Sequence, residues 1–333
     1  MTKRFLMMLA ILFAFCGQAM AQELQFNNPL AEQRADPWVW KDTDGTYYLI
    51  ATVPEYDRIV LRSAKTINGL KDAEEKTLWE KHSSGVMGAH IWAPELHKID
   101  GKWYIYFAAG EVENIWNIRM WVLSCNGKDP MKGKWKEEGQ IKTKTSSFSL
   151  DATVFEHKGK NYLIWAQNVH NWASGTSLVM AEMKSPTEIT GPEIVITDPT
   201  FDWERQKYNV NEGPAVIKND GKIFVSYSAS ATNHNYCMGL LWIDGDQDIM
   251  DLKNWNKSPG PVFYTNEDLK RYGPGHNSFT TSEDGSKTVM IYHARDYKQI
   301  KGHELSDTNR ATRAREVKWL DSGFPDFRQM IGD

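Results

Sequence analysis

Cysteine is scarce in this chain. Of its 333 residues three are cysteines, and Cys16 lies in an N-terminal apolar stretch, which leaves Cys125 and Cys237 for the rest of the protein. Two cysteines are too few for the disulfide framework that holds small exported domains together. They could still pair, but we expect both to be buried thiols. The sequence therefore excludes a disulfide scaffold.

Long hydrophobic runs are equally scarce. The one substantial run, residues 5–15, follows two basic residues and precedes Ala19-Met20-Ala21. This is the pattern of a secretory signal peptide, and the run is too short to cross the roughly 30 Å of hydrocarbon in a bilayer. We therefore predict a signal peptide at residues 1–21, cleaved after Ala21, and an exported, periplasmic or secreted chain that does not span the membrane.

An excess of positive charge and the common catalytic signatures are also absent. The formal net charge is −4 at pH 7, which disfavours a nucleic-acid partner and fits a neutral substrate. The sequence contains no H-E-x-x-H, no P-loop, no G-x-S-x-G and no C-x-x-C. It also has no low-complexity or Pro/Gly/Ser-rich linker. We expect residues 22–333 to form one domain, and the protein to be a monomer.

What the chain does contain is a hairpin pattern that occurs five times. Each copy is an apolar run, a turn with glycine, and a second run rich in β-branched and aromatic residues. Successive turn glycines lie 56 to 64 residues apart; they are Gly45, Gly101, Gly159, Gly221 and Gly285. Strand units that repeat at such intervals are typical of propeller blades. The sequence therefore predicts an all-β fold, a five-bladed β-propeller.

One position in each copy carries a chemically distinctive side chain. It lies nine residues before the turn glycine, or eight in the third copy, and is occupied in chain order by Asp36, Trp92, Asp151, Glu212 and His276. Because side chains alternate along a strand, an equal distance from the turn indicates an equal facing. If these strands are the innermost of their blades, three carboxyls converge on the propeller axis.

Three carboxyls on one face suit the hydrolysis of a glycosidic bond. That reaction needs a proton donor for the leaving oxygen and a carboxylate that attacks or activates water. Glu212 lies among apolar residues and beside Gly213 and Pro214, and burial there should raise its pKa, as a general acid requires. Asp36, from another blade, could activate a water. Asp36 could instead be a turn cap before Pro37, but the shared position with the other two acids favours a role in chemistry.

Several further residues are candidates for substrate contacts. Trp38, Trp92 and Trp165 could stack on sugar rings, although ordinary packing explains tryptophan equally well. His90 could contact substrate or be a hydrogen-bonded core histidine. Arg295 could be the counter-charge of one acid or a surface residue.

For two further residues, the strand pattern allows more than one role or orientation. His276 could ligate a metal or a hydrated cation on the axis, or be satisfied by neighbouring side chains. Glu95 lies an odd number of residues from Trp92, so it should face away from the axis unless a β-bulge intervenes.

The motifs together resemble those of glycoside hydrolase family 43, a family of five-bladed propeller arabinosidases and xylosidases. The resemblance covers essentially the whole exported chain and rests on Ala35-Asp36-Pro37, Trp92-Ala93-Pro94-Glu95, Leu150-Asp151-Ala152, Asn211-Glu212-Gly213-Pro214 and Gly275-His276-Asn277-Ser278. It implies that Asp36 is the general base, Glu212 the general acid and Asp151 the group that modulates the pKa of the acid. It also implies inversion at the anomeric carbon.

The same resemblance implies further properties. No cofactor is needed for the chemistry, and His276 corresponds to a channel histidine that in many members sits by a calcium or sodium ion. Arg295 corresponds to an arginine near the modulator aspartate. Within the family the motifs look most like exo-acting α-L-arabinofuranosidases, which act on neutral oligo- or polysaccharides. A β-xylosidase, a galactan-directed hydrolase and a non-catalytic sugar-binding propeller are the alternatives.

Overall fold

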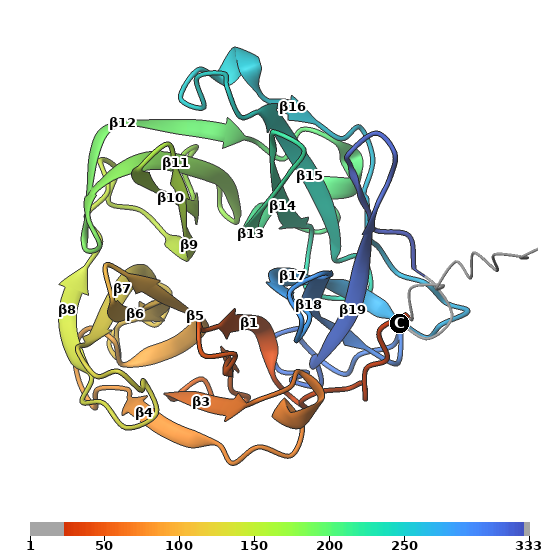
Figure 1. The fold of residues 1–333 in the computed structure, drawn as a ribbon. Coiled ribbons are helices and arrows are strands. Elements are labelled where there is room, and N and C mark those ends of the chain that lie inside the picture. The colour runs from red at the N-terminus through yellow and green to blue at the C-terminus, as the bar shows by residue number, and fades with distance from the viewer. Residues whose placement is uncertain (1–22, 330–333) are drawn as a thin grey trace, which may run out of the picture.

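The computed structural model describes residues 23–329, and it is a five-bladed β-propeller, as the sequence predicts (Figure 1). The signal peptide predicted at residues 1–21 lies outside the described residues. Each blade is a four-stranded antiparallel sheet whose strands follow one another in the chain from the axis outwards. A short parallel pairing of β11 with β13 also joins the third and fourth blades.

The strands of equal rank share a position in every blade. The innermost strands are β1 (Ala35–Lys41), β5 (Ala89–Ile99), β9 (Ser149–His157), β13 (Asn209–Asn219) and β17 (Tyr272–Thr281). The second strands are β2 (Tyr47–Thr52), β6 (Lys102–Gly110), β10 (Lys160–Gln167), β14 (Lys222–Ala229) and β18 (Thr288–Arg295). The third strands are β3 (Arg58–Ala64), β7 (Arg119–Cys125), β11 (Gly175–Ser185), β15 (Cys237–Asp244) and β19 (Ala311–Trp319). The outer strands are β4 (Lys76–Glu80), β8 (Lys136–Gln140), β12 (Glu188–Thr197), β16 (Asn256–Lys257) and β20 (Pro325–Asp326).

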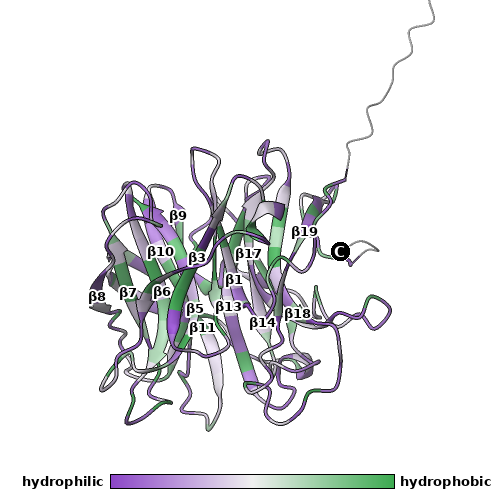
Figure 2. Ribbon diagram, turned by 90° about the horizontal axis from the view of Figure 1, so that it is seen from below, coloured by the Kyte–Doolittle hydropathy of each residue, from purple (hydrophilic) through white to green (hydrophobic). Residues whose placement is uncertain are grey.

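Helices are limited to three short 3₁₀ turns in the described part of the chain: η1 (Asn68–Leu70), η2 (Asp202–Glu204) and η3 (Leu252–Asn254). No helix within residues 23–329 is long and apolar enough to cross a membrane. Figure 2 shows the strands from the side, running between two ends of the molecule where the connecting loops gather.

The hydrophobic core lies between the blades. A four-stranded sheet cannot cover both of its own faces, so each blade buries its apolar side chains against its neighbours. Pairs from adjacent blades illustrate this around the ring: Ile50 with Ile105, Tyr106 with Leu163, Ile164 with Val225, Phe224 with Tyr292, and Leu49 with Ile291. Cys125 and Cys237 are both buried and unpaired, as expected from the sequence.

The ring is closed between the segment that precedes the first blade and β19 of the last blade. The backbone N–H of Leu30 donates to the carbonyl oxygen of Thr312 at 2.8 Å, and the N–H of Thr312 donates to the carbonyl oxygen of Ala31 at 2.8 Å. Leu24 and Phe26 pack in the same apolar cluster as Leu30, between the last and the first blade. The segment before the first blade therefore fastens the fifth blade to the first.

Every innermost strand contains a bulge near its start. The ladder with the second strand is interrupted there by residues with a positive φ: Asp36 (53°), His90 (50°), Ala93 (43°), Asp151 (57°), Gly213 (53°), Gly273 (58°) and His276 (43°). This backbone conformation is uncommon for residues other than glycine and re-aims side chains at a bulge. A bulge does intervene between Trp92 and Glu95. Glu95 is buried, and its Oε2 lies 2.8 Å from Nε2 of His97.

Candidate active site

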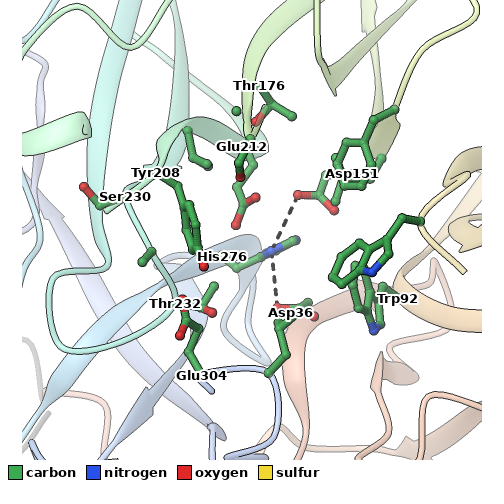
Figure 3. Close-up of a pocket in the computed structure, with 18 of the residues that line it drawn as sticks. Asp36, Trp92, Asp151, Thr176, Tyr208, Glu212, Ser230, Thr232, His276 and Glu304 are labelled. Carbon is green, nitrogen blue, oxygen red and sulfur yellow. Dashed lines mark ion pairs between the residues drawn. The ribbon is translucent and has the colours of Figure 1, made fainter. Parts of the chain in front are cut away.

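A cavity of about 490 Å³ opens at the end of the propeller where the innermost strands begin. All five blades contribute to its lining, and Asp36, Trp92, Asp151, Glu212 and His276 come from five different innermost strands (Figure 3). The sequence predicted this convergence from the shared position before each turn. The size lies within the usual range of small-ligand sites, about 300–1,000 Å³.

Asp36 is held as a carboxylate by donors and positive charge. The hydroxyl of Thr52 donates to its Oδ2 at 2.7 Å, and Nη1 of Arg310 donates to its Oδ1 at 3.1 Å. The backbone N–H of Asp36 donates to Nδ1 of His293 at 3.0 Å. Burial would raise the pKa of Asp36, but Arg310, His276 and His293 outweigh that effect and hold the pKa well below its usual range. Asp36 is thus ionised at neutral pH.

Glu212, in contrast, is kept protonated up to near-neutral pH. Burial raises its pKa, the negative charge of Asp36 raises it further, and the pKa reaches about 7. The hydroxyl of Tyr236 donates to Oε1 of Glu212 at 2.7 Å and opposes this rise, as does Arg310. Tyr236 is itself buried, with its ring stacked on His293 at 5.5 Å between centroids.

Asp151 lies beside both other acids. Burial and the nearby charges of Glu212 and Asp36 raise the pKa of Asp151 well above its usual range. Its Oδ2 accepts the backbone N–H of Gly213 at 3.0 Å. Because Gly213 directly follows Glu212, this hydrogen bond fixes the strand that carries Glu212.

His276 lies between the carboxyls of two blades. Its Nδ1 is 3.4 Å from Oδ1 of Asp36 and 3.9 Å from Oδ2 of Asp151 (Figure 3). Its backbone N–H donates to the hydroxyl of Ser228 at 2.7 Å, and burial lowers the pKa of its imidazole. Gly213 leaves room for this ring, because a Cβ at Gly213 would come within 3.0 Å of it.

A metal ion at His276 would have few further side-chain ligands. Among residues 23–329 no group of three or more histidine, cysteine, aspartate or glutamate side chains is arranged to hold a metal ion. Asp36, one of the two carboxyls that face His276, is already paired with the guanidinium of Arg310. An ion close to His276 would meet that positive charge at short range.

Three of the expected substrate contacts do not line the cavity. Trp165 is completely buried and its Nε1 donates to Gln167 at 2.8 Å, so it is a core residue. Trp38 donates from Nε1 to the carbonyl oxygen of Leu96 and packs on His97. His90 stacks behind Trp92 with ring centroids 4.3 Å apart. Of the aromatic residues predicted from the sequence, Trp92 alone is part of the cavity wall.

The prediction that Arg295 is the counter-charge of one of the three acids is wrong. Arg295 is buried, and its Nε donates to Oδ1 of Asp307 at 3.1 Å. Its Nη1 and Nη2 donate to the carbonyl oxygens of Thr232, Glu304 and Asp307. The guanidinium therefore holds the loop between β18 and β19, and Arg310 at the end of that loop supplies the charge beside Asp36.

Sequence reasoning missed four residues that contact the acids: Thr52, His293, Arg310 and Tyr236. Arg310 opens the run Arg310-Ala311-Thr312-Arg313-Ala314-Arg315, which reads as a strand with a charged face. Arg310 and Arg313 are both buried. A buried strand with regularly spaced arginines implies buried carboxylates, and this signal could have identified Arg310. Tyr236 lies outside every recurring motif, so the sequence offered no signal for it.

The three carboxyls can thus provide an ionised base and a protonated acid in one cavity. This is the requirement for acid–base hydrolysis of a glycosidic bond. Trp92, Phe148 and Leu150 give the cavity an apolar side against which a sugar ring can lie, and Trp116, which is 53% exposed, continues this side outwards.

Comparison with known proteins agrees with this arrangement. The model of glycosyl hydrolases family 43 matches residues 26–325. The extracellular exo-α-(1→5)-L-arabinofuranosidase of Streptomyces avermitilis is 54% identical over 92% of this chain, which spans 64% of that relative's length. The corresponding enzyme of Streptomyces chartreusis is 53% identical over 83% of this chain and 84% of its own length.

A solved structure leads to the same family. The crystal structure of α-L-arabinofuranosidase from Lactobacillus brevis superposes with a TM-score of 0.89 at 45% identity, covering 92% of this chain and 97% of that one. The match to the family model runs from Phe26 in the closing segment to Pro325 at the start of β20. This chain belongs to glycosyl hydrolases family 43.

Proposed function

We propose that this protein is an inverting, exo-acting α-L-arabinofuranosidase that releases L-arabinofuranose from arabinan or from arabinose-decorated plant polysaccharides and oligosaccharides. The observation that carries the proposal is the opposite protonation of two carboxyls in one cavity. Arg310 keeps Asp36 ionised. Burial and the charge of Asp36 raise the pKa of Glu212 to about 7, so Glu212 stays protonated up to near-neutral pH. A site that only binds sugars would not need this separation.

In the proposed mechanism Asp36 accepts a proton from a water molecule as that water attacks the anomeric carbon. Glu212 gives its proton to the glycosidic oxygen as the bond to the leaving group breaks, and the anomeric configuration inverts. Asp151 orients the acid through the N–H of the adjacent Gly213. The charge of Glu212 raises the pKa of Asp151, and this like-charge repulsion between the two carboxyls supports the modulating role that the family resemblance implies.

The exo mode is supported by a loop segment that forms one side of the cavity and is held in place by hydrogen bonds. His303, Glu304 and Leu305 lie in that wall. Both carboxylate oxygens of Glu304 accept from Nζ of Lys207, at 2.9 and 2.7 Å, and the carbonyl oxygen of Leu305 accepts the hydroxyl of Tyr56 at 2.9 Å. A wall held in place by these three hydrogen bonds favours a pocket for a terminal sugar over an open groove.

The choice of sugar is supported by the relatives. The Streptomyces avermitilis and Lactobacillus brevis proteins are both named as α-L-arabinofuranosidases, and both match more than nine-tenths of this chain. Export is supported by the N-terminal pattern of residues 1–21 and by the extracellular names of the two Streptomyces relatives. A monomeric state remains part of the proposal.

A structural calcium or sodium ion on the axis, bound to His276 directly or through water, also remains a proposal. Thermal unfolding after dialysis against EDTA, with calcium or sodium then added back separately, tests it. A rise of Tm with one ion supports that ion, and equal Tm values under all conditions argue against both.

A hydrolysis screen tests the proposed function. We expect release of arabinose from an aryl α-L-arabinofuranoside and from arabinan, with the product anomer followed by NMR. Inversion should appear as initial release of the β-anomer from an α-linked substrate. Preferential cleavage of aryl β-xyloside or of galactan would instead favour the xylosidase or galactan-directed alternative. Sugar binding without any hydrolysis would leave a non-catalytic propeller.

A further inference from the structure

Exposed apolar side chains gather beside the cavity on two neighbouring loops of the second blade. Val86, Val112, Ile115 and Trp116 are 39 to 53% exposed, and we call them the apolar ridge. Val86 lies in the loop between β4 and β5, and the other three lie in the loop between β6 and β7. Large exposed apolar residues that cluster in this way usually mark a binding surface.

The two loops are built to hold this shape. The N–H of Val112 donates to the carbonyl oxygen of Gly85, and the N–H of Gly88 donates to that of Gly110, both at 2.9 Å. A Cβ at Gly88 would come within 2.1 Å of Val112, and one at Gly110 within 2.2 Å of the backbone of Ile115. Only glycine allows such close approach, so the ridge is a fixed surface.

An aromatic stack connects the ridge to the cavity. His90 lies between two tryptophans, with its ring 4.3 Å from that of Trp92 and 4.9 Å from that of Trp116. Nδ1 of His90 is 3.0 Å from the carbonyl oxygen of Ile115, which fixes the ring in this position. Trp92 and Trp116 both line the cavity, so the cavity wall and the ridge form one continuous surface.

The chemistry of this surface suits a neutral carbohydrate. The four side chains of the ridge are uncharged, while Glu113 of the same loop accepts the N–H of Gly85 with its carboxylate. Tryptophan stacks on the apolar faces of sugar rings.

We infer that the apolar ridge is a binding site for the part of a polysaccharide substrate that extends outside the cavity, with Trp116 as its main stacking residue. The inference rests on the proposed function, because its occupant is the same chain whose terminal sugar enters the cavity. The ridge determines preference for polymer over short substrates, and the carboxyls perform the hydrolysis.

The test compares two substrates in the same variants. We expect Trp116→Ala to lower the ratio of kcat/KM for arabinan to kcat/KM for an aryl α-L-arabinofuranoside by about fivefold or more, mainly through KM for arabinan. Trp116→Phe should restore most of the ratio, and Ile115→Ser should lower it less. Tyr264→Ala is the matched control, because Tyr264 is 56% exposed and lies outside the cavity lining.

Failure of the inference differs from failure of the proposed function. If the wild-type protein cleaves neither arabinofuranosyl substrate, the proposed function fails. If it cleaves both and Trp116→Ala leaves the ratio unchanged, or lowers both activities equally, the ridge does not bind the polymer. Unchanged thermal unfolding of Trp116→Ala and Ile115→Ser would show that the loops keep their fold.

Discussion

The hydroxyl of Tyr236 donates a 2.7 Å hydrogen bond to Oε1 of Glu212, on the residue that most needs to keep its proton. A donor to a carboxylate favours its ionised form, so Tyr236 lowers the pKa of Glu212 against the effect of burial. The pKa of about 7 is the balance of these effects. Tyr236 thus prevents the proposed acid from holding its proton too tightly to release it.

Tyr236→Phe is expected to move the alkaline limb of the pH profile of kcat/KM to higher pH, because the pKa of Glu212 rises when its donor is lost. Loss of one hydrogen bond should also lower kcat about three- to tenfold. Tyr106→Phe is the matched control: it removes a buried hydroxyl that donates to the carbonyl oxygen of Pro186, away from the cavity. A downward shift of the alkaline limb in Tyr236→Phe would contradict the assignment.

Glu212→Gln is expected to abolish hydrolysis and to stabilise the fold at pH 8. A carboxyl whose pKa rises on folding, from about 4.5 to about 7, costs stability as pH increases through that interval. Glutamine removes this cost, which at full size is roughly 3 kcal/mol. Urea unfolding should therefore show a gain at pH 8 that nearly disappears at pH 4.5. An equal gain at both pH values would mean that ionisation of Glu212 is not its cause.

Asp36→Asn is expected to lower kcat by about 10²- to 10⁴-fold, because asparagine cannot accept a proton from water. The fold should persist, as judged by circular dichroism and thermal unfolding. Asp44→Asn, in an exposed turn of the same blade, serves as the control and should retain activity. Activity of Asp36→Asn within tenfold of the wild type would remove Asp36 from the role of base.

Arg310→Met is expected to move the acidic limb of the pH profile to higher pH, because Arg310 lowers the pKa of Asp36. It also leaves a buried carboxylate without its strongest counter-charge, which should cost about 3–5 kcal/mol of stability at pH 7. This cost should shrink as pH falls and Asp36 becomes protonated. Arg205→Met removes an exposed pair with Asp202 and should cost less than about 1 kcal/mol.

The fold and the convergence of the acids could be predicted because both depend on regular spacing. Turn glycines such as Gly101 and Gly221 adopt positive φ in the tight turns that separate the first two strands of a blade. Fixed distances from those turns then bring Asp36 and Glu212 to the same end. The catalytic roles assigned to them remain predictions until activity is measured.

The bulges and the partners of the acids could not be predicted. Asp36 and His276 adopt a left-handed backbone without being glycine, a conformation imposed by tertiary packing. Arg310 and Tyr236 come from a loop end and from the segment before β15, where no periodic pattern fixes the direction of a side chain. Arg295 carries a positive charge that could have paired with one of the three acids. Its N–H groups donate to backbone carbonyl oxygens instead.

Closure of the ring has a consequence for when the proposed active site is complete. Asp36 follows the closing segment and Arg310 precedes Thr312, so their ion pair joins residues 274 positions apart in the chain. A partly synthesised or clipped chain that lacks the fifth blade would hold Asp36 without its cation and with a higher proton affinity. The proposed acid–base pair would then be complete only in the last step of folding, when the first and fifth blades come together.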